Sequence, residues 1–344
     1  MKAGKTDEMA TTSVPAGGLT EAQLLTVLRN MLTQRAVDNR GFQLNRQGKI
    51  AIAMGSEGHE AVQAGAGLAF VRGKDLLYPY YRNTGITIAC GLPVEDVFRS
   101  QFARATDSTG GRSIINHVTA RSRGIASISS TIAAQCPHAA GAAYALKYRG
   151  ESDRAVLCTF GEGATSEGEW HEAMNFSAIH QVPVIWLCEN NQWAISTPIS
   201  KQMRNTTVAV RAGGYGIEGV TVDGFDPLAV YRAVRAARRK AVEGGGPTLI
   251  EAKCYRFLSH TTDDDDRTYR TRDEVERQRS LDPIPRFERY LIERNIITPE
   301  SLEALKAEIA RTVNEITDRI EAEPLPDRSS LYTNLYAGEA EPWR

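Results

Sequence analysis

Apolar runs alternate with helical patterns along the middle of the chain. Residues 155–160 and 182–188 are each an almost continuous apolar run, which is typical of strands buried on both faces of a parallel sheet. Between them the pattern predicts a crossover helix that ends near His180 and begins with a capping box of Ser166 and Glu169. The two runs and the helix form a βαβ unit, whose crossover should be right-handed.

The same alternation extends in both directions. A helix rich in small residues is expected over 134–148, before the first strand. After the second strand we expect a strand near 220–222, a helix over 226–242 that stops at a glycine-rich turn, and a strand over 248–254. Together these elements predict an α/β fold with a doubly wound parallel sheet and helices on both faces.

The N-terminal segments are less regular than this repeat. Thr20 and Gln23 form a capping box that precedes a helical apolar pattern, and a second helical stretch is expected over 55–72. Residues 75–100 include a short tyrosine-rich stretch. Residues 101–127 lack periodicity and are expected to form a long loop.

The C-terminal part differs in composition from the α/β repeat. Beyond Ser259 the chain becomes polar and acidic, a helix is expected from 300 to about 322, and prolines near the end predict an extended arm. We therefore divide the chain into a flexible tail over 1–18, an α/β domain over 19–290, and a helical segment with an extended arm over 291–344.

Charge and composition exclude several classes of protein. The 344 residues contain 41 Lys and Arg against 42 Asp and Glu, so there is no basic excess for nucleic acid or a membrane surface. No apolar run approaches the about 18 residues of a membrane span.

Five scattered cysteines without a CxxC pair predict reduced, buried thiols. With no secretory or transit features at the N-terminus, we expect a cytoplasmic protein of bacterial or archaeal type, a mitochondrial matrix location being less favoured.

Polar side chains follow the buried strands at their carboxyl ends, where open parallel sheets bind ligands. Glu162 follows the first strand, Asn191 the second, and His260 the strand that ends near Cys254. A carboxylate and an amide are oxygen ligands that suit Mg²⁺, which completes its shell with substrate phosphates and water. The pair predicts a magnesium–diphosphate site, and the alternative that both side chains only cap loops stays open at this point.

A dinucleotide site is the main competing interpretation. Gly161 and Gly163 precede a helix and Glu189 ends the next strand, as in NAD-binding folds. However, Ser166 stands at the third glycine position, and the carboxylate of Glu162 would repel a pyrophosphate unless a metal lay between them. An NAD-dependent oxidoreductase, which would bind NADH without Mg²⁺, is therefore disfavoured.

Longer motifs are more specific than these single residues. Residues 161–168 (GEGATSEG) and 189–198 (ENNQWAISTP) resemble the two halves of the thiamine diphosphate motif, at the spacing that the motif requires. Over about residues 20–340 the chain resembles the alpha subunit of heterotetrameric thiamine diphosphate-dependent 2-oxo acid dehydrogenases, and residues 194–198 are most similar to the branched-chain (2-oxoisovalerate) member. Shorter matching segments are 44–48, Tyr81 with Arg82, 129–130, Gln135, 142–145 and 282–284.

The resemblance implies how the cofactor is held. Glu162 and Asn191 would bind Mg²⁺ through their side chains, and Trp193 through its backbone carbonyl. Tyr81 and Arg82 would hold the diphosphate, for which an arginine fork is well suited. Backbone atoms of four further residues would contact the cofactor: Gly163 and Ala164 the phosphates, and Ser130 and Ile132 the aminopyrimidine.

The resemblance also implies catalytic and regulatory positions. His260 would lie beside the diphosphate and the reacting carbons, where an imidazole can donate to an oxyanion or move a proton. Glu57 aligns with a family glutamate near the site. Glu189 replaces an arginine that touches phosphate in some relatives. Thr261 and Thr271 lie in an acidic loop that aligns with one phosphorylated in some relatives, and an added phosphate here would be repelled by neighbouring aspartates.

The implied reaction is the decarboxylation of a 2-oxo acid, with thiamine diphosphate as electron sink and transfer of the acyl group to a lipoyl group on a partner acyltransferase. No second, pyrimidine-binding domain with its glutamate follows residue 270, and in this family that glutamate belongs to a beta subunit. The chain is therefore expected to contribute half of an active site at the subunit interface of an α₂β₂ heterotetramer. A pyruvate or acetoin dehydrogenase alpha subunit is the alternative within the family, and a non-catalytic subunit is disfavoured because the motif residues are present.

Overall fold

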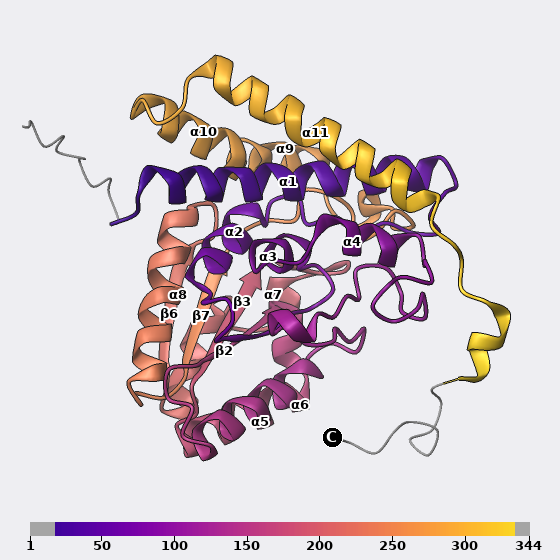
Figure 1. Ribbon diagram of the computed structural model, residues 1–344. Coiled ribbons are helices and arrows are strands. Elements are labelled where there is room, and N and C mark those ends of the chain that lie inside the picture. The colour runs from indigo at the N-terminus through magenta and orange to yellow at the C-terminus, as the bar shows by residue number, and fades with distance from the viewer. Residues whose placement is uncertain (1–17, 334–344) are drawn as a thin grey trace, which may run out of the picture.

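A five-stranded parallel sheet forms the centre of the protein in the computed structural model, which describes residues 18–333 (Figure 1). The strand order is β1-β2-β3-β7-β6, and every neighbouring pair is parallel. A separate antiparallel ladder joins β4 and β5. The strands are β1 (Leu76–Tyr78), β2 (Val156–Gly161), β3 (Val184–Asn190), β4 (Trp193–Ala194), β5 (Thr197–Pro198), β6 (Glu218–Asp223) and β7 (Thr248–Lys253).

Helices cover both faces of the sheet, which confirms the predicted doubly wound α/β fold (Figure 1). Successive residues of β2 and β3 enter two separate cores. Leu157 and Ile185 pack with α1, α2 and α8, whereas Cys158 and Trp186 pack with α5 and α6. The helices of these layers are α1 (Glu21–Arg46), α2 (Glu60–Ala69), α3 (Thr84–Ala89), α4 (Val94–Gln101), α5 (Gln135–Tyr148), α6 (Gly168–His180), α7 (Ile199–Gln202) and α8 (Pro227–Val242).

The C-terminal helices lie against the long first helix (Figure 1). The capping box of Thr20 and Gln23 is confirmed: the threonine hydroxyl accepts from the Gln23 N–H, and the Gln23 side chain accepts from the Thr20 N–H. The domain boundary predicted at residue 290 falls inside α10. Residues of α10 and α11 pack into the same hydrophobic core as α1. These helices are α9 (Arg272–Arg279), α10 (Pro283–Glu293) and α11 (Pro299–Glu321).

Two of the sequence-based expectations about local structure are wrong. Ser166 and Glu169 form no capping box, because a 3-10 turn over Glu162–Ser166 follows β2 directly and α6 begins only at Gly168. The helical stretch expected over 55–72 is confined to α2, and residues 55–59 form the turn that leads into it.

The long loop and the cysteines agree with the sequence-based expectations, whereas most of the two chain ends lies outside the described residues. Residues 102–134 form a long loop whose only helical element is a 3-10 turn. All five cysteines are buried and free. No helix within residues 18–333 combines the length and the apolar character needed to cross a bilayer. The predicted tail lies almost wholly outside the described residues, as does the end of the predicted arm. The remaining 3-10 turns are Arg121–Arg123, Val208–Tyr215, Asp266–Thr268 and Arg328–Tyr332.

Two helical glycines should respond in opposite ways to a methyl group. A Cβ at Gly65 of α2 would lie 2.3 Å from the carbonyl oxygen of Pro227 at the start of α8, whereas a Cβ at Gly141 of α5 would meet nothing within 4 Å. Gly65→Ala should therefore lower the free energy of unfolding by about 1–3 kcal/mol through overpacking. Gly141→Ala should raise it by about 0.5–1 kcal/mol, because alanine loses less backbone entropy in a helix. Urea unfolding of both variants checks this, and equal effects would contradict the close α2–α8 packing.

Candidate active site

A cavity lies at the carboxyl ends of the central strands, where the sequence placed the ligand site. Its walls come from the loop after β1, the loop before α5, the turn after β2, the segment after β3 and the segment after β7. Nine of the residues predicted to contact the cofactor or metal line it: Tyr81, Arg82, Ile132, Glu162, Gly163, Ala164, Asn191, Trp193 and His260.

Glu162 presents a buried carboxylate to the cavity. It begins the turn after β2 and is 1 % exposed. One oxygen accepts from the Asn191 N–H at 3.2 Å, and the other accepts from Gln202 at 3.5 Å. Among residues 18–333 no side chain forms an ion pair with it, and burial raises its pKa. A bound divalent cation would supply the missing countercharge.

Oxygen atoms around Glu162 fit a hard cation. The side-chain oxygen of Asn191 accepts from the Trp193 N–H at 3.0 Å and keeps a second lone pair. The side-chain oxygen of Gln202 is buried without a hydrogen-bond partner in the described structure, and a Cβ at Gly163 would lie 3.6 Å from it. No cluster of three or more His, Cys, Asp or Glu suited to a metal occurs in the part of the chain described here. A metal at this place would depend on one carboxylate together with amide and carbonyl oxygens, which suits Mg²⁺.

Two buried arginines also line the cavity and bring positive charge to it. Arg82 and Arg256 are 2 % and 1 % exposed, and within residues 18–333 neither forms an ion pair with a carboxylate. Burial and the nearby Arg82 lower the pKa of Arg256 to about 10. Its guanidinium donates to the carbonyl of Ile195 at 2.8 Å. Buried cations without countercharges beside a cavity fit a multiply charged anion such as a diphosphate.

The backbone that lines the cavity is closely packed and in places has an unusual conformation. A Cβ at Gly163 would lie 2.7 Å from the Cβ of Ala194, so only glycine fits between the turn and β4. Gly163 and Ala164 stand at the start of the 3-10 turn, where N–H groups have no partner within the turn. Ala133 and Ile195, which both line the cavity, have left-handed backbone conformations with φ of 67° and 53°. Such strained residues are concentrated at functional sites.

His260 is held as a neutral imidazole. Its Nδ1 lies 3.1 Å from Arg82 and 3.5 Å from Arg256. Since a guanidinium can only donate, Nδ1 must accept and the proton resides on Nε2. Burial and the two arginines lower the pKa of His260 to about 3. The ring can therefore donate a hydrogen bond from Nε2, which agrees with its predicted role beside an oxyanion.

This lowered pKa predicts a specific pH dependence of stability. Between about pH 6.5 and pH 3 the unfolded chain binds a proton at His260 that the folded chain does not. The contribution of the neutral His260 to the unfolding free energy is therefore present above pH 6.5 and is lost as the pH falls. His260→Gln should therefore lose less unfolding free energy than the wild type between pH 7.5 and pH 5. Urea unfolding at both pH values checks this, and identical losses would show that His260 titrates normally.

Ser130 and Glu57 are not among the residues that line the cavity. The Ser130 hydroxyl is hydrogen-bonded to His117 Nε2 at 2.9 Å. The Glu57 carboxylate accepts from Arg279 at 2.9 Å and forms an ion pair with Arg35 at 3.4 Å. A cofactor contact through the Ser130 backbone and a catalytic role for Glu57 stay predictions.

The acidic loop after β7 contacts the site through the side chain of Asp264. Asp264 accepts from the backbone N–H of His260 at 2.8 Å. The hydroxyl of Thr271 accepts from the Glu274 N–H and caps α9, and the hydroxyl of Thr261 accepts from the Asp263 N–H.

Sequence reasoning missed two groups at this site. Arg256 lies four residues before His260 and shortly after the buried strand β7, a position that could have revealed it. Gln202 lies on α7, too far along the chain from either motif to be found by spacing.

Comparison with known proteins decides the family. Residues 28–329 match the dehydrogenase E1 component family. The chain belongs to this family. The E1 components are thiamine diphosphate-dependent enzymes, so the predicted enzyme class and the predicted thiamine diphosphate are confirmed, whereas Mg²⁺ stays a prediction.

Several curated relatives of this E1 chain are similar over almost its whole length. The 2-oxoisovalerate dehydrogenase subunit alpha of Bacillus subtilis (strain 168) is 42% identical over 330 residues, which cover 96% of this chain and 100% of the relative. The mitochondrial 2-oxoisovalerate dehydrogenase subunit alpha of Homo sapiens is 37% identical, with 92% and 71% covered. The 3-methyl-2-oxobutanoate dehydrogenase subunit alpha of Mycobacterium tuberculosis (strain ATCC 25618 / H37Rv) is 37% identical, with 93% and 84% covered. Because the relatives include bacterial and mitochondrial proteins, the cytoplasmic location stays a prediction.

Proposed function

We propose that this E1 chain is the alpha subunit of a branched-chain 2-oxo acid dehydrogenase and supplies the diphosphate half of its active site. The proposal is carried by a cavity lined by one buried carboxylate and two buried arginines, none of which forms an ion pair within residues 18–333. That charge pattern suits a divalent cation bound to a diphosphate. The names of the relatives support 2-oxoisovalerate-type substrates, with transfer of the acyl group to the lipoyl group of an acyltransferase.

In this proposal the metal is held from three positions. Glu162 and Asn191 bind Mg²⁺ through side-chain oxygens, and Trp193 binds it through its backbone carbonyl. The 3.2 Å contact between the Glu162 carboxylate and the Asn191 N–H already brings the two ligand residues together. The buried oxygen of Gln202 is available for a water on the metal.

The diphosphate is held by groups that surround the metal. Arg82 and Arg256 supply positive charge, and the N–H groups of Gly163 and Ala164 supply neutral donors. Tyr81 packs edge-on against His260, with ring centroids 6.0 Å apart, and so limits the orientation of the imidazole. These contacts fix the phosphate end of the cofactor before the substrate arrives.

When bound, thiamine diphosphate supplies the electron sink for loss of CO₂. The residues of this chain bind its phosphates, exclude water and hold a proton on His260 Nε2. That proton can stabilise negative charge on the substrate oxygen. The glutamate needed at the pyrimidine ring comes from a beta subunit, so the proposal includes an α₂β₂ heterotetramer with the cofactor at the subunit interface.

Co-expression of this chain with a candidate beta subunit tests the proposal. The purified pair should decarboxylate 2-oxoisovalerate in the presence of thiamine diphosphate and Mg²⁺, with a higher kcat/KM than for pyruvate or 2-oxobutyrate, and each subunit alone should be inactive. Preference for pyruvate would support the alternative substrate class. Full activity of this chain alone would refute the half-site arrangement.

A further inference from the structure

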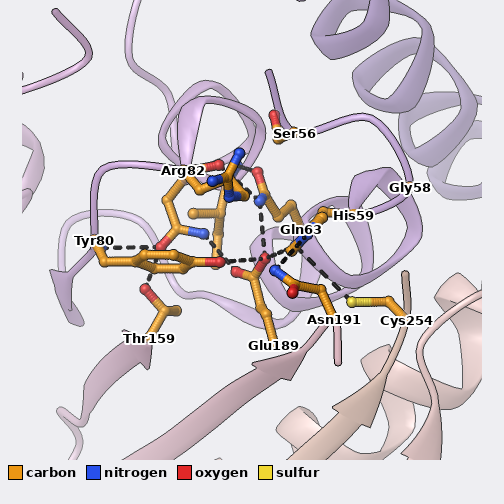
Figure 2. A network of polar contacts seen from close by, with 12 residues as sticks. Ser56, Gly58, His59, Gln63, Tyr80, Arg82, Thr159, Glu189, Asn191 and Cys254 are labelled. Carbon is orange, nitrogen blue, oxygen red and sulfur yellow. Dashed lines mark hydrogen bonds and ion pairs between the residues drawn. The ribbon is translucent and has the colours of Figure 1, made fainter. Parts of the chain in front are cut away.

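His59 lies between Glu189 and Asn191 in a buried network beside the proposed metal site (Figure 2). The side chains of His59 and Glu189 are fully buried, and Asn191 is 4 % exposed. The roles assigned above do not use His59 or Glu189. Their placement nevertheless points to a role, because His59 contacts the proposed metal ligand Asn191 directly.

The fold brings these residues together from distant parts of the chain. Ile185 and Leu187 of β3 pack into the core that contains α2, so Glu189, two residues further along the strand, also faces α2. His59 immediately precedes α2. Asn191 directly follows β3 and reaches the cavity.

Glu189 determines which nitrogen of His59 carries the proton. Its carboxylate accepts from His59 Nδ1 at 2.6 Å, Gln63 at 3.0 Å and Tyr80 at 3.3 Å (Figure 2). It also accepts from Asn83. A carboxylate with these four neighbours acts as the acceptor, so Nδ1 carries a proton. The other ring nitrogen, Nε2, is left for the contact with Asn191.

Nε2 contacts the Asn191 amide. It lies 3.3 Å from Asn191 Nδ2, which can only donate. On the other side of the amide, the Asn191 oxygen accepts from the Trp193 N–H at 3.0 Å. A half-turn of the amide would place two donors together at Trp193 and two acceptors together at His59. The Trp193 N–H therefore fixes which end of the amide is oxygen, and the amide nitrogen that remains donates to His59 Nε2.

We propose that His59, held by Glu189, is a positioning residue that keeps the Asn191 side-chain oxygen available to the metal. The proposal rests on the metal-binding role proposed above for Asn191. Outer partners that orient a metal ligand commonly change metal affinity by about 10–100-fold when they are replaced.

Metal binding by two His59 variants tests this inference. His59→Leu keeps an apolar side chain but removes the acceptor, whereas His59→Gln offers a side-chain oxygen near the place of Nε2. Each would be co-expressed with the beta subunit and titrated with Mn²⁺ at saturating thiamine diphosphate, with free Mn²⁺ followed by electron paramagnetic resonance. We expect about 10–100-fold weaker Mn²⁺ binding for His59→Leu. His59→Gln should recover most of this loss.

A matched control separates positioning from general destabilisation. Thr317 is also buried, and its hydroxyl accepts a hydrogen bond from Arg40 at 3.0 Å on the other side of α1. Thr317→Val should lower the thermal midpoint while leaving the Mn²⁺ affinity unchanged. If His59→Leu and His59→Gln lose affinity equally, or if His59→Leu binds Mn²⁺ like the wild type, the inference is overturned.

A double-mutant cycle with Asn191 distinguishes this inference from the proposed function. In the Asn191→Ala background, His59→Leu should cause little further loss, because the amide that it orients is gone. Additive losses would overturn the positioning role and leave the metal role of Asn191 intact. Unchanged Mn²⁺ affinity in Asn191→Ala alone would overturn the metal role of that residue and this inference with it.

Discussion

Glu162→Gln should abolish Mg²⁺-dependent binding of thiamine diphosphate without destabilising the cofactor-free protein. The glutamine keeps the shape and an acceptor for the Asn191 N–H, but it removes the charge that neutralises the metal. Loss of one partner of a buried ion pair costs about 3–5 kcal/mol, so a loss of metal affinity of at least 100-fold is expected. Titration calorimetry of Mg²⁺ at saturating thiamine diphosphate measures this directly.

The stability of the cofactor-free protein provides an independent check of the same residue. Burial raises the folded pKa of Glu162, so the stability associated with its protonated form is lost as the pH rises through that pKa. At pH 8 the apo Glu162→Gln variant should unfold at a temperature equal to or above that of the wild type. Glu169→Gln, at an exposed position on α6, should change neither quantity. A large drop in apo stability for Glu162→Gln would instead indicate a structural role.

Arg82→Met should cause the second largest loss. Arg82 is buried, contacts His260 and has no carboxylate partner within residues 18–333, so its charge is available to a bound anion. Methionine fills similar space without the charge. Hydrogen bonds from charged groups contribute about 1.5–3 kcal/mol each, which predicts roughly 10–100-fold weaker binding of thiamine diphosphate.

The same substitution should change the behaviour of His260. Arg82 is the largest charged contributor to its lowered pKa, so this pKa should rise in Arg82→Met and the acid loss of stability should become smaller. Arg29→Met, which removes an exposed ion pair with Glu308 on the outer helices, serves as the matched control and should leave cofactor affinity unchanged. Normal affinity in Arg82→Met would remove the arginine from the phosphate site.

The sheet and the metal side of the site could be predicted because they depend on local patterns. Apolar runs identify buried strands, and residues that follow such strands meet at one edge of the sheet. Glu162 and Asn191 were placed together for this reason. The strand β1 could not be predicted, because its three residues are too few to show a hydrophobic pattern. It is recognised as a strand only through its parallel pairing with β2.

The positive side of the site and the network around His59 depend on contacts between distant segments. Arg82 and Arg256 are recognisable as a pair only once the loop after β1 meets the segment after β7. Likewise, the contact of His59 with Glu189 joins the start of α2 to the end of β3. The predicted start of α6 was wrong, because residues Glu162–Ser166 form a 3-10 turn of their own and the α-helix begins only after it.

Magnetic coupling between a bound metal and the cofactor phosphates is the most direct test of the central claim. The co-expressed protein would be loaded with thiamine diphosphate and with Mn²⁺ in place of Mg²⁺, and the ³¹P couplings measured by electron–nuclear double resonance. A metal held by Glu162 and Asn191 and shared with the diphosphate predicts strong ³¹P coupling that disappears in Glu162→Ala. Bound thiamine diphosphate without ³¹P coupling, or coupling unchanged in Glu162→Ala, would contradict the account.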